Sequence, residues 1–442
     1  MKTIIINSMN WKISKLKNKK IIGAALIACF AIGALVSSWS DTSTGESEVK
    51  KEMKEMVLVH HYPEKIDTIR VLLLADDGTI YHKSKDAKKE GDLTYFCDKD
   101  GNTKGLGYPG IMEIHSEAQG YVFVNEVDVE DYVARVLPSE MPESFGLNAL
   151  KAQAICARTY IYSLSKERGY MDYNALVDDS INFQEYNKLP TTTLSDQACQ
   201  ETHGQILVKN YSAVESLYHS TSCGFTQTGD IFGNKYDTEL LQSKYIGVPA
   251  TADKNSAAHP IDFDSYLRTV DNFAFEKDEK YFRWMIRINV DEKLDSIKNR
   301  IISMKEDDPK NIIYEGDGPS GKITHMDLVE RSKGGAITSL MLTFENGTVT
   351  ISDQLEIRRI LGAGITQVFL NDGSRPEGVT SLYSSAFTWD VGQNGNYVLY
   401  GGGYGHGVGM SQYGAKDLSE AGFSYTDILE FFYTDAIVYP LD

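Results

Sequence analysis

Short hydrophobic runs separated by Gly, Asp and Asn dominate the chain between residues 69 and 124. Each run has the length of one strand and is rich in β-branched or aromatic residues, which is typical of strands. The runs lie at residues 69–74, 80–81, 93–96, 111–114 and 121–124. The pattern therefore predicts a β-rich layer in the N-terminal part of the fold.

The periodicity becomes helical after residue 146. Apolar side chains recur every three or four positions, at Leu147, Leu150, Ala154, Ala157 and Ile161, and this spacing places them on one face of a helix. We expect this helix to cover about residues 147–168. The following segments predict a helix at 195–203 and strands at 206–208 and 213–219.

The hydrophobic pattern is uneven and charged from about residue 250 to 320, which indicates an inserted segment. The regular patterns in the C-terminal half predict strands at 283–288, 323–329, 337–344 and 349–351 and helices at 294–304 and 353–361. We find no internal repeat. The predicted fold class is α+β: a β-rich N-terminal layer, a helix after a proline-rich turn, further strands and an inserted segment.

A membrane anchor is predicted at the N-terminus. The apolar run at residues 21–39 has roughly the 20 residues that a helix needs to cross a bilayer. Lysines precede the run at Lys12, Lys15, Lys17, Lys19 and Lys20. By the positive-inside rule, residues 1–20 are then a cytoplasmic tail, 40–56 a polar stalk and 57–442 an extracytoplasmic domain.

Two alternatives to a retained anchor remain. Signal peptidase cleaves near Ser38 in one, and Cys29 is acylated as in a bacterial lipoprotein in the other. The second is less favoured, because an apolar run would directly follow the acylated cysteine.

The formal net charge of −18 argues against nucleic acid as a partner and against docking on an anionic bilayer. One of the five cysteines lies in the apolar N-terminal run. The others, Cys97, Cys156, Cys199 and Cys223, show no paired short spacing, so disulfides are permitted outside the cell but are not indicated.

Glu140 stands between two prolines in the sequence Pro-Ser-Glu-Met-Pro at 138–142. Proline fixes its own φ and disfavours helix in the residue before it, so we expect a fixed turn at the entrance of the helix that begins near Leu147. The carboxylate is then either a cap near a positive helix end or a catalytic acid. Lys151, Arg158 and Tyr160 can approach it only if the chain folds back on the first turns of this helix.

Two further stretches have an unusual composition. Residues 218–226 end a predicted strand in small polar side chains, where a scaffold presents groups to a ligand. Residues 401–415 contain seven glycines around Tyr404 and His406. Their spacing is not that of a P-loop or a dinucleotide fingerprint.

Read together, these stretches resemble the stage II sporulation protein D family, which also contains the amidase-enhancer proteins. The resemblance is carried by Val-Asn-Glu-Val at 124–127, Pro-Ser-Glu-Met-Pro at 138–142, Leu-Lys-Ala-Gln-Ala at 150–154, Ala-Arg-Thr-Tyr at 157–160, His-Ser-Thr-Ser at 219–222 and Gly-His-Gly-Val-Gly-Met-Ser-Gln-Tyr-Gly-Ala at 405–415. It implies a membrane-anchored lytic transglycosylase that cuts peptide-free peptidoglycan glycan strands. It also implies a partner amidase during engulfment of the forespore.

The residues themselves allow this chemistry. A carboxyl group that stays protonated near neutral pH in apolar surroundings can donate a proton to the glycosidic oxygen, and Glu140 has Met141 and two prolines beside it. A hydrolase normally needs two carboxylates. In a transglycosylase the muramic acid 6-hydroxyl replaces water, so one glutamate can act as acid and then as base. Glu143 is more simply a first-turn helix residue.

The remaining candidate residues are predicted to hold the sugar. Lys151 and Arg158 are candidates for the lactyl carboxylate of muramic acid, although Lys151 also fits a solvated helix face and Arg158 a buried pair with a carboxylate elsewhere. The candidates for hydroxyl and acetamido groups are His219, Ser220, Ser222, Tyr404, His406, Gln412 and Tyr413.

His219 and Cys223, together with Cys199 and His203, offer the ligand types of a structural zinc site. By the resemblance, however, Cys223 stands where the family usually has glycine. We therefore expect no metal and no cofactor. A non-catalytic amidase enhancer, or a wall-binding scaffold that uses the same groove, is the alternative function.

Overall fold

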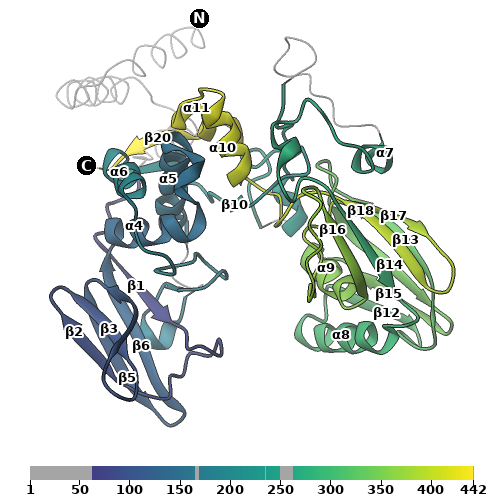
Figure 1. Cartoon of the computed structure of the whole chain (residues 1–442), viewed down its shortest axis with the longest axis horizontal. Coiled ribbons are helices and arrows are strands. Elements are labelled where there is room, and N and C mark those ends of the chain that lie inside the picture. Colours follow the sequence, from purple (N-terminus) through teal and green to yellow (C-terminus); the bar gives the residue numbers. More distant parts are fainter. Residues whose placement is uncertain (1–61, 165–168, 234, 249–261, 442) are drawn as a thin grey trace, which may run out of the picture. The chain divides into compact units, whose positions relative to one another are not determined.

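The structure, a computed structural model, describes residues 62–164, 169–233, 235–248 and 262–441. It contains helices and mixed sheets, so the predicted α+β class is confirmed (Figure 1). The predicted tail (1–20), anchor (21–39) and stalk (40–56) lie outside the described residues, as do residues 57–61 of the predicted extracytoplasmic domain. In the part that is described, no helix is both long enough and apolar enough to cross a membrane.

The N-terminal strands form two sheets, of order β5-β6-β1-β7 and β2-β3-β4. Their bounds are β1 Thr68–Leu73, β2 Ala87–Glu90, β3 Leu93–Cys97, β4 Thr103–Tyr108, β5 Ile111–Glu117, β6 Gly120–Asp128 and β7 Val177–Asp178. The prediction of a strand at 80–81 is wrong. This segment leaves a turn in which the Asp77 carboxylate accepts the Thr79 N–H at 3.1 Å, and only His82 makes a bridge, to Tyr121.

Helix α4, Val129–Glu140, directly follows β6 and was not predicted. Asp128 caps its N-terminus by accepting the Glu130 N–H at 2.8 Å, and the helix closes where the Met141 N–H bonds the Leu137 carbonyl at 2.9 Å. The expected turn is therefore wrong, because Pro138 lies inside the last helical turn. Burial of one apolar face of α4 outweighs the local preference of proline.

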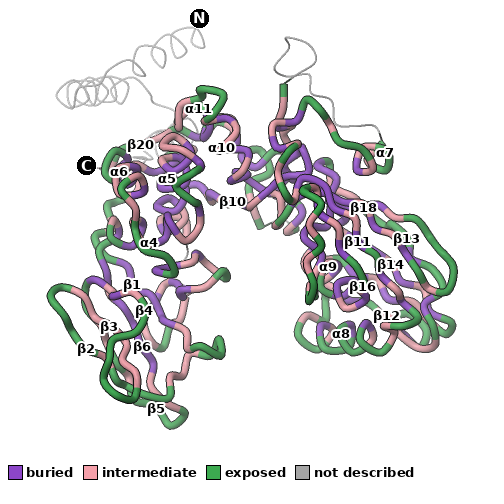
Figure 2. The backbone as a smooth tube through the Cα atoms, viewed as in Figure 1, coloured by how far each residue is buried: buried purple, intermediate pink, exposed green. Residues whose placement is uncertain are grey.

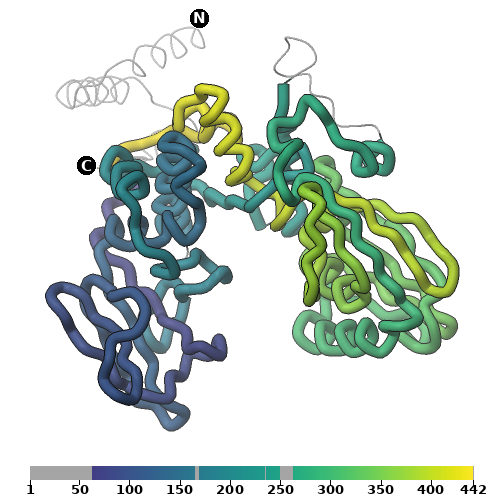
Figure 3. Tube along the Cα trace, viewed as in Figure 1, coloured from purple at the N-terminus to yellow at the C-terminus, as the bar shows by residue number. Residues whose placement is uncertain are grey.

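Helix α5, Leu147–Ser163, begins where it was predicted, after the short 3₁₀ turn η1 at Glu143–Phe145, and ends before the predicted residue 168. Most of its side chains are buried all round, as the purple tube in Figure 2 shows. The C-terminal helices α10, Gln412–Glu420, and α11, Tyr425–Phe432, contact it (Figure 3). The two ends of the described chain therefore share one core.

The described chain has two main hydrophobic cores. The first contains buried residues from Ile69 to Ile246 and then again from Val408 to Ala436, whereas the second runs from Trp284 to Leu399. The inserted body consequently extends well beyond the predicted 250–320.

This body contains the sheets β16-β11-β18-β17 and β12-β15-β14-β13. Its elements are α7 Phe263–Leu267, η5 Phe275–Asp278, β11 Trp284–Asn289, α8 Leu294–Asp307, β12 Ile312–Gly316, β13 Ile323–Arg331, β14 Ile337–Phe344, β15 Gly347–Ile351, α9 Gln354–Gly362, β16 Ile365–Leu370, β17 Phe387–Val391 and β18 Asn396–Gly401. The strands and helices predicted between 283 and 361 are confirmed.

A short parallel pair brings two distant motifs together. Strand β10, Tyr218–His219, pairs with β19, Met410–Ser411, so that His219 lies opposite Ser411. The expected continuous strand at 213–219 is wrong, since only β9, Ser212–Ala213, and β10 are extended in a ladder. The helix and strand predicted around residue 200 are confirmed as α6, Thr193–Glu201, and β8, Gln205–Lys209. Strand β8 pairs with the C-terminal β20, Ile437–Pro440. Two short 3₁₀ turns also belong to this region, η3 Met171–Tyr173 and η4 Gly229–Phe232.

Candidate active site

A cleft of about 530 Å³ lies where the three motif stretches meet. Among its lining residues are six of the predicted site residues: Glu140, His219, Ser220, Tyr404, His406 and Gln412. They come from the end of α4, from β10 and the residue after it, from the glycine-rich loop and from the start of α10. Residues far apart in the sequence therefore form one concave surface of the size of a ligand site.

The Glu140 carboxylate is held at the cleft by groups from other segments. Its Oε1 accepts the Glu185 N–H at 2.9 Å, and Gln412 Nε2 donates to the Glu140 backbone carbonyl at 3.1 Å. The polar side chains of Tyr218 and Gln412 also favour the charged form of the carboxyl group. Burial opposes the charged form more strongly and raises the pKa of Glu140 above the ordinary glutamate value. The carboxyl group is thus poised to carry a proton at a higher pH than a solvated glutamate.

A line of buried polar side chains leads to Tyr218. The Tyr132 hydroxyl lies 3.3 Å from Gln184 Oε1, and Gln184 Nε2 donates to the Tyr218 hydroxyl oxygen at 3.2 Å. Because its oxygen already accepts this bond, the Tyr218 hydroxyl has its own proton free to donate to Glu140. Tyr218 therefore both orients Glu140 and favours its charged form.

Glu185 brings a second carboxylate to the cleft. Its negative charge adds to the effect of burial on the pKa of Glu140. Sequence reasoning missed Glu185, because it lies in a loop with no recognisable motif, and treated Glu143 as the only second carboxylate. Glu143 is exposed in η1 and does not line the cleft.

The two histidines of the cleft are neutral near pH 7. His219 donates from Nδ1 to the Val408 carbonyl at 3.2 Å, whereas His406 accepts the Val408 N–H at Nδ1 at 3.0 Å. Burial is the main cause that lowers the pKa of His219 to about 3 and of His406 to about 4. The Nε2 atom of His219 has no hydrogen-bond partner in the described structure, so it is available as an acceptor.

The glycine-rich loop needs its glycines because it runs against β10. At Gly409, with φ of 73°, an added Cβ would lie 1.9 Å from the Leu217 carbonyl oxygen. At Gly405, with φ of 108°, it would lie 3.0 Å from the Cβ of His219. Both positions are therefore closed to side chains, and the close approach puts Tyr404 and His406 beside His219.

Ser222 lies outside the cleft lining and serves another purpose. Its N–H donates at 2.9 Å to Glu276, a fully buried carboxylate of η5, and its hydroxyl also bonds that carboxylate. Ser411 donates to the same carboxylate at 2.6 Å. Glu276 thus connects the inserted body to β19 and to the segment that follows β10, and burial raises its pKa.

The other predicted sugar ligands also lie outside the cleft lining. Arg158 is buried and forms two parallel hydrogen bonds with Glu130, at 2.7 and 2.6 Å, so the structure agrees with its alternative interpretation as a buried pair. Lys151 forms an ion pair with Glu201. The Tyr413 ring packs against Phe145, with 4.7 Å between centroids.

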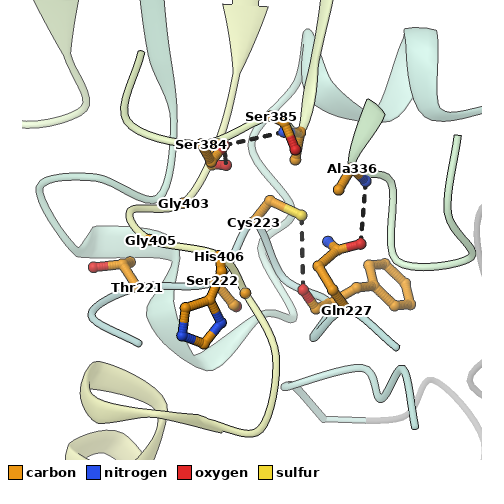
Figure 4. Close-up of a pocket in the computed structure, with 14 residues that line it drawn as sticks. Thr221, Ser222, Cys223, Gln227, Ala336, Ser384, Ser385, Gly403, Gly405 and His406 are labelled. Atoms are coloured by element: carbon orange, nitrogen blue, oxygen red, sulfur yellow. Dashed lines mark hydrogen bonds between the residues drawn. The ribbon is translucent and has the colours of Figure 1, made fainter. Parts of the chain in front are cut away.

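The four candidate zinc ligands do not form a metal site. Among the residues that the structure describes, no group of three or more His, Cys, Asp or Glu side chains could hold a metal. Figure 4 shows Cys223 in a separate small cavity of about 10 Å³, room for about one water molecule. There its thiol faces the carbonyl oxygens of Phe225 and Gly334, at 3.8 and 3.6 Å. That activity needs no zinc stays a prediction.

Comparison with known proteins agrees with this arrangement. The family model of the stage II sporulation protein matches residues 117–209, and a domain of unknown function, DUF8618, matches residues 239–409. The chain is 27% identical over 325 residues to stage II sporulation protein D of Bacillus amyloliquefaciens, a match that covers 70% of this chain and 74% of that protein. The chain is therefore similar to the stage II sporulation protein D family, whose model it matches over residues 117–209.

Other relatives carry two different names. Stage II sporulation protein D of Bacillus subtilis is 26% identical over 328 residues, which cover 70% of this chain and 74% of that protein. The amidase enhancer of the same organism is 28% identical over 317 residues, which cover 67% of this chain but only 39% of the enhancer. Glu140 and Glu185 fall in the first matched domain, and Tyr404 and His406 in the second.

The placement of Arg158 predicts a stability defect in Arg158→Met. Removing the buried Arg158 guanidinium takes two charged hydrogen bonds from the partly exposed Glu130 carboxylate, and hydrogen bonds to charged groups are worth about 1.5–3 kcal/mol of unfolding free energy. Lys151→Met is the matched control: it breaks a more exposed pair, which is worth at most about 1 kcal/mol. Urea denaturation of both variants measures the difference. Equal effects of the two substitutions would contradict this placement.

Burial of Glu140 predicts how Glu140→Gln changes stability with pH. A raised folded-state pKa means that the wild type has its full stability below the unfolded value of about 4.3. It loses stability as the pH rises through the raised value. The variant lacks this loss. The difference in unfolding free energy, variant minus wild type, should therefore increase between these two pKa values. Urea denaturation over a pH series tests this, and curves that stay parallel would argue against a raised pKa.

Proposed function

We propose that this protein is a peptidoglycan lytic transglycosylase. It cleaves peptide-free glycan strands and leaves 1,6-anhydro-muramic acid ends, with Glu140 as general acid and base. The observation that carries this proposal is the partly buried carboxylate at the cleft, whose pKa is raised while the Glu185 N–H holds the carboxylate and Gln412 holds the Glu140 backbone. A protonated carboxyl group in a fixed pose is what general acid catalysis requires near neutral pH.

The reaction balances with this one glutamate. Glu140 donates its proton to the glycosidic oxygen as the bond from that oxygen to the anomeric carbon breaks. The 6-hydroxyl of muramic acid then attacks the anomeric carbon, which forms the anhydro ring. The hydroxyl proton returns to Glu140 and restores it.

Glu185 fits a supporting role in this step. Positive charge develops at the anomeric carbon in such a transition state, and a second carboxylate in the same cleft stabilises it. Its backbone N–H holds Glu140 at the same time. A single loop residue thus serves both the position of the acid and the electrostatics of the cleft.

The rest of the cleft supplies contacts for sugar. The Tyr404 side chain is 40% exposed and gives a ring face with a hydroxyl group. Ser220 offers a hydroxyl, and the His219 ring lines the cleft beside it. Neutral donors and acceptors of this kind suit hydroxyl and acetamido groups.

A non-catalytic amidase enhancer or wall-binding scaffold is the second candidate. The relative named amidase enhancer favours it. In that case the same cleft grips glycan without cutting it, and Glu140 is a binding group. A cell-wall amidase is the proposed partner under both functions.

The proposed place of action is the cell envelope during sporulation. The similarity to the stage II sporulation protein D family supports sporulation, and the lysine cluster before residues 21–39 supports a retained membrane anchor. Residues 57–442 then face peptidoglycan outside the membrane. The domain division at 1–20, 21–39 and 40–56 is part of this proposal.

The catalytic proposal predicts the effect of Glu140→Gln on turnover. The amide keeps the shape but cannot donate a proton to the glycosidic oxygen, so cleavage should fall by roughly 10²–10⁴ or more. Glycan affinity should change little. Glu143→Gln is the control and should retain activity. Mass spectrometry of anhydro ends on peptide-free strands measures both variants; a wild type that never cleaves would move the choice to the enhancer.

Tyr218→Phe predicts a shift in the pH profile. The Tyr218 hydroxyl favours the charged form of Glu140, so its loss should raise the pKa of Glu140 further. The high-pH limb of kcat/KM, where the acid loses its proton, should move to higher pH. Tyr404→Phe removes another hydroxyl of the cleft and should weaken binding without moving this limb. A limb that is unmoved in Tyr218→Phe, or that moves to lower pH, would refute the assignment.

A further inference from the structure

A second cavity, of about 440 Å³, lies in the inserted body. It is formed by α7 and by two strands that are edges of their sheets, β13 and β17. None of its lining residues lines the Glu140 cleft. This cavity belongs to the part of the chain that matches a domain of unknown function.

Two aromatic rings in the cavity are fixed by the cores behind them. The Phe263 ring packs against Phe225, with 6.1 Å between centroids, and against Tyr266, with 6.2 Å. The Trp389 ring packs against Phe387, with 6.0 Å between centroids. Both side chains stay partly exposed, and Leu328 of β13 is 46% exposed beside them. Fixed ring faces of this kind can receive the C–H face of a pyranose without loss of side-chain entropy.

Polar groups of the cavity are also held in place. Arg331 donates from Nη2 to the Phe387 carbonyl at 2.7 Å, and in the described structure no carboxylate lies within ion-pair distance of its guanidinium. Asp264 accepts from Arg268 at 3.1 Å and also bonds the Thr388 hydroxyl. Rigid aromatic rings beside fixed donors and acceptors suit a ligand with both C–H faces and hydroxyl groups. Lipid would not use the polar groups, and the nearby aspartates disfavour a polyanion.

The chain path connects this cavity closely to the cleft. Trp389 lies opposite Leu399 in the β17–β18 pair. From Leu399 the chain passes through Gly401 to Tyr404, and five residues span at most about 18 Å. A polysaccharide of several units is long enough to bridge such a separation, whereas a single sugar is not.

We propose that the cavity at Phe263, Leu328 and Trp389 is a second glycan-binding site, which holds a remote part of the same strand that enters the Glu140 cleft. The proposal rests on glycan being the substrate, and it assigns a role to the inserted body. It holds the strand through ring faces and hydroxyl contacts and takes no part in bond cleavage.

Tryptophan indole NMR tests this directly, because two of the four tryptophans report on the two sites. Trp284 Nε1 donates to the Gly403 carbonyl at 3.1 Å, next to Tyr404, so its signal reports on the cleft. The Trp389 signal reports on the second cavity. The full chain carrying Glu140→Gln, which prevents cleavage, is titrated with long peptide-free glycan strands, and Trp→Phe variants assign the signals. Both signals should move.

Leu328→Arg places a long side chain at the cavity and keeps both reporters. It should abolish the Trp389 response and weaken the affinity for long strands about tenfold. The binding of a disaccharide fragment should stay the same. Val391→Arg is the matched control, since Val391 is 69% exposed on β17, the strand that carries Trp389, but does not line the cavity. It should leave both responses intact, and thermal melting checks that each variant is folded.

The outcomes separate this proposal from the proposed function. A Trp284 signal that moves while Trp389 stays fixed overturns the second site alone, as does unchanged affinity in Leu328→Arg. A Trp389 signal that responds only to stem peptide also overturns it, in favour of a peptide site. If Trp389 responds to glycan but the wild type never cleaves, the second site stands and the transglycosylase fails. If neither signal moves, both fail.

Discussion

The geometry of the site depends on a carboxylate that is kept out of water at the junction of distant segments. Glu140 ends α4, and Gln412 Nε2 donates to its backbone carbonyl at 3.1 Å across 272 positions of sequence. Glu185 and Tyr218 hold the carboxylate itself. Since these donors favour the charged form and burial disfavours it, the proton affinity of Glu140 is a balance that only the complete fold sets.

A second buried carboxylate, Glu276, links the inserted body to segments of the first core. Glu276 comes from the inserted body, and its partners Ser222 and Ser411 belong to the two loops that carry the cleft histidines and the glycines. The inserted body is therefore tied to the geometry of the cleft, whatever it binds on its own surface. In the part of the chain that the structure describes, the Glu276 carboxylate accepts from three donors and has no ion pair with a cation. Such a buried carboxylate is costly to form, which is consistent with a positional role.

Much of the fold follows from local pattern, whereas the site follows only in part. The strands near residues 93–96 and 337–344 and the helix from Leu147 were predictable because their apolar periodicity also faces a core. Helix α4 was missed because Pro138 is a local signal against helix, and the signal loses to the burial of one apolar face. The Glu140 motif and the glycine-rich motif contain Glu140, Tyr404, His406 and Gln412 of the cleft lining, since glycines mark places where the backbone must approach closely.

The remaining errors concern partners that sequence does not show. Arg158 has the charge for a ligand carboxylate, but the fold gives it Glu130, 28 positions away. Glu185 has no motif around it, and only the loop that follows β7 brings it to Glu140. A charged residue in a motif can thus stabilise the fold without contacting a ligand. A residue outside every motif can line the site.

The most direct test of the central claim is the titration of the Glu140 side chain itself. Carbon-13 NMR of the glutamate carboxyl groups, with Glu140→Gln to assign the signal, gives its pKa in the folded protein. The account predicts a pKa above the ordinary glutamate value of about 4.3, because burial outweighs the polar groups that favour the charged form. A pKa at or below that value would contradict it, since Glu140 would then lack the proton that the reaction requires.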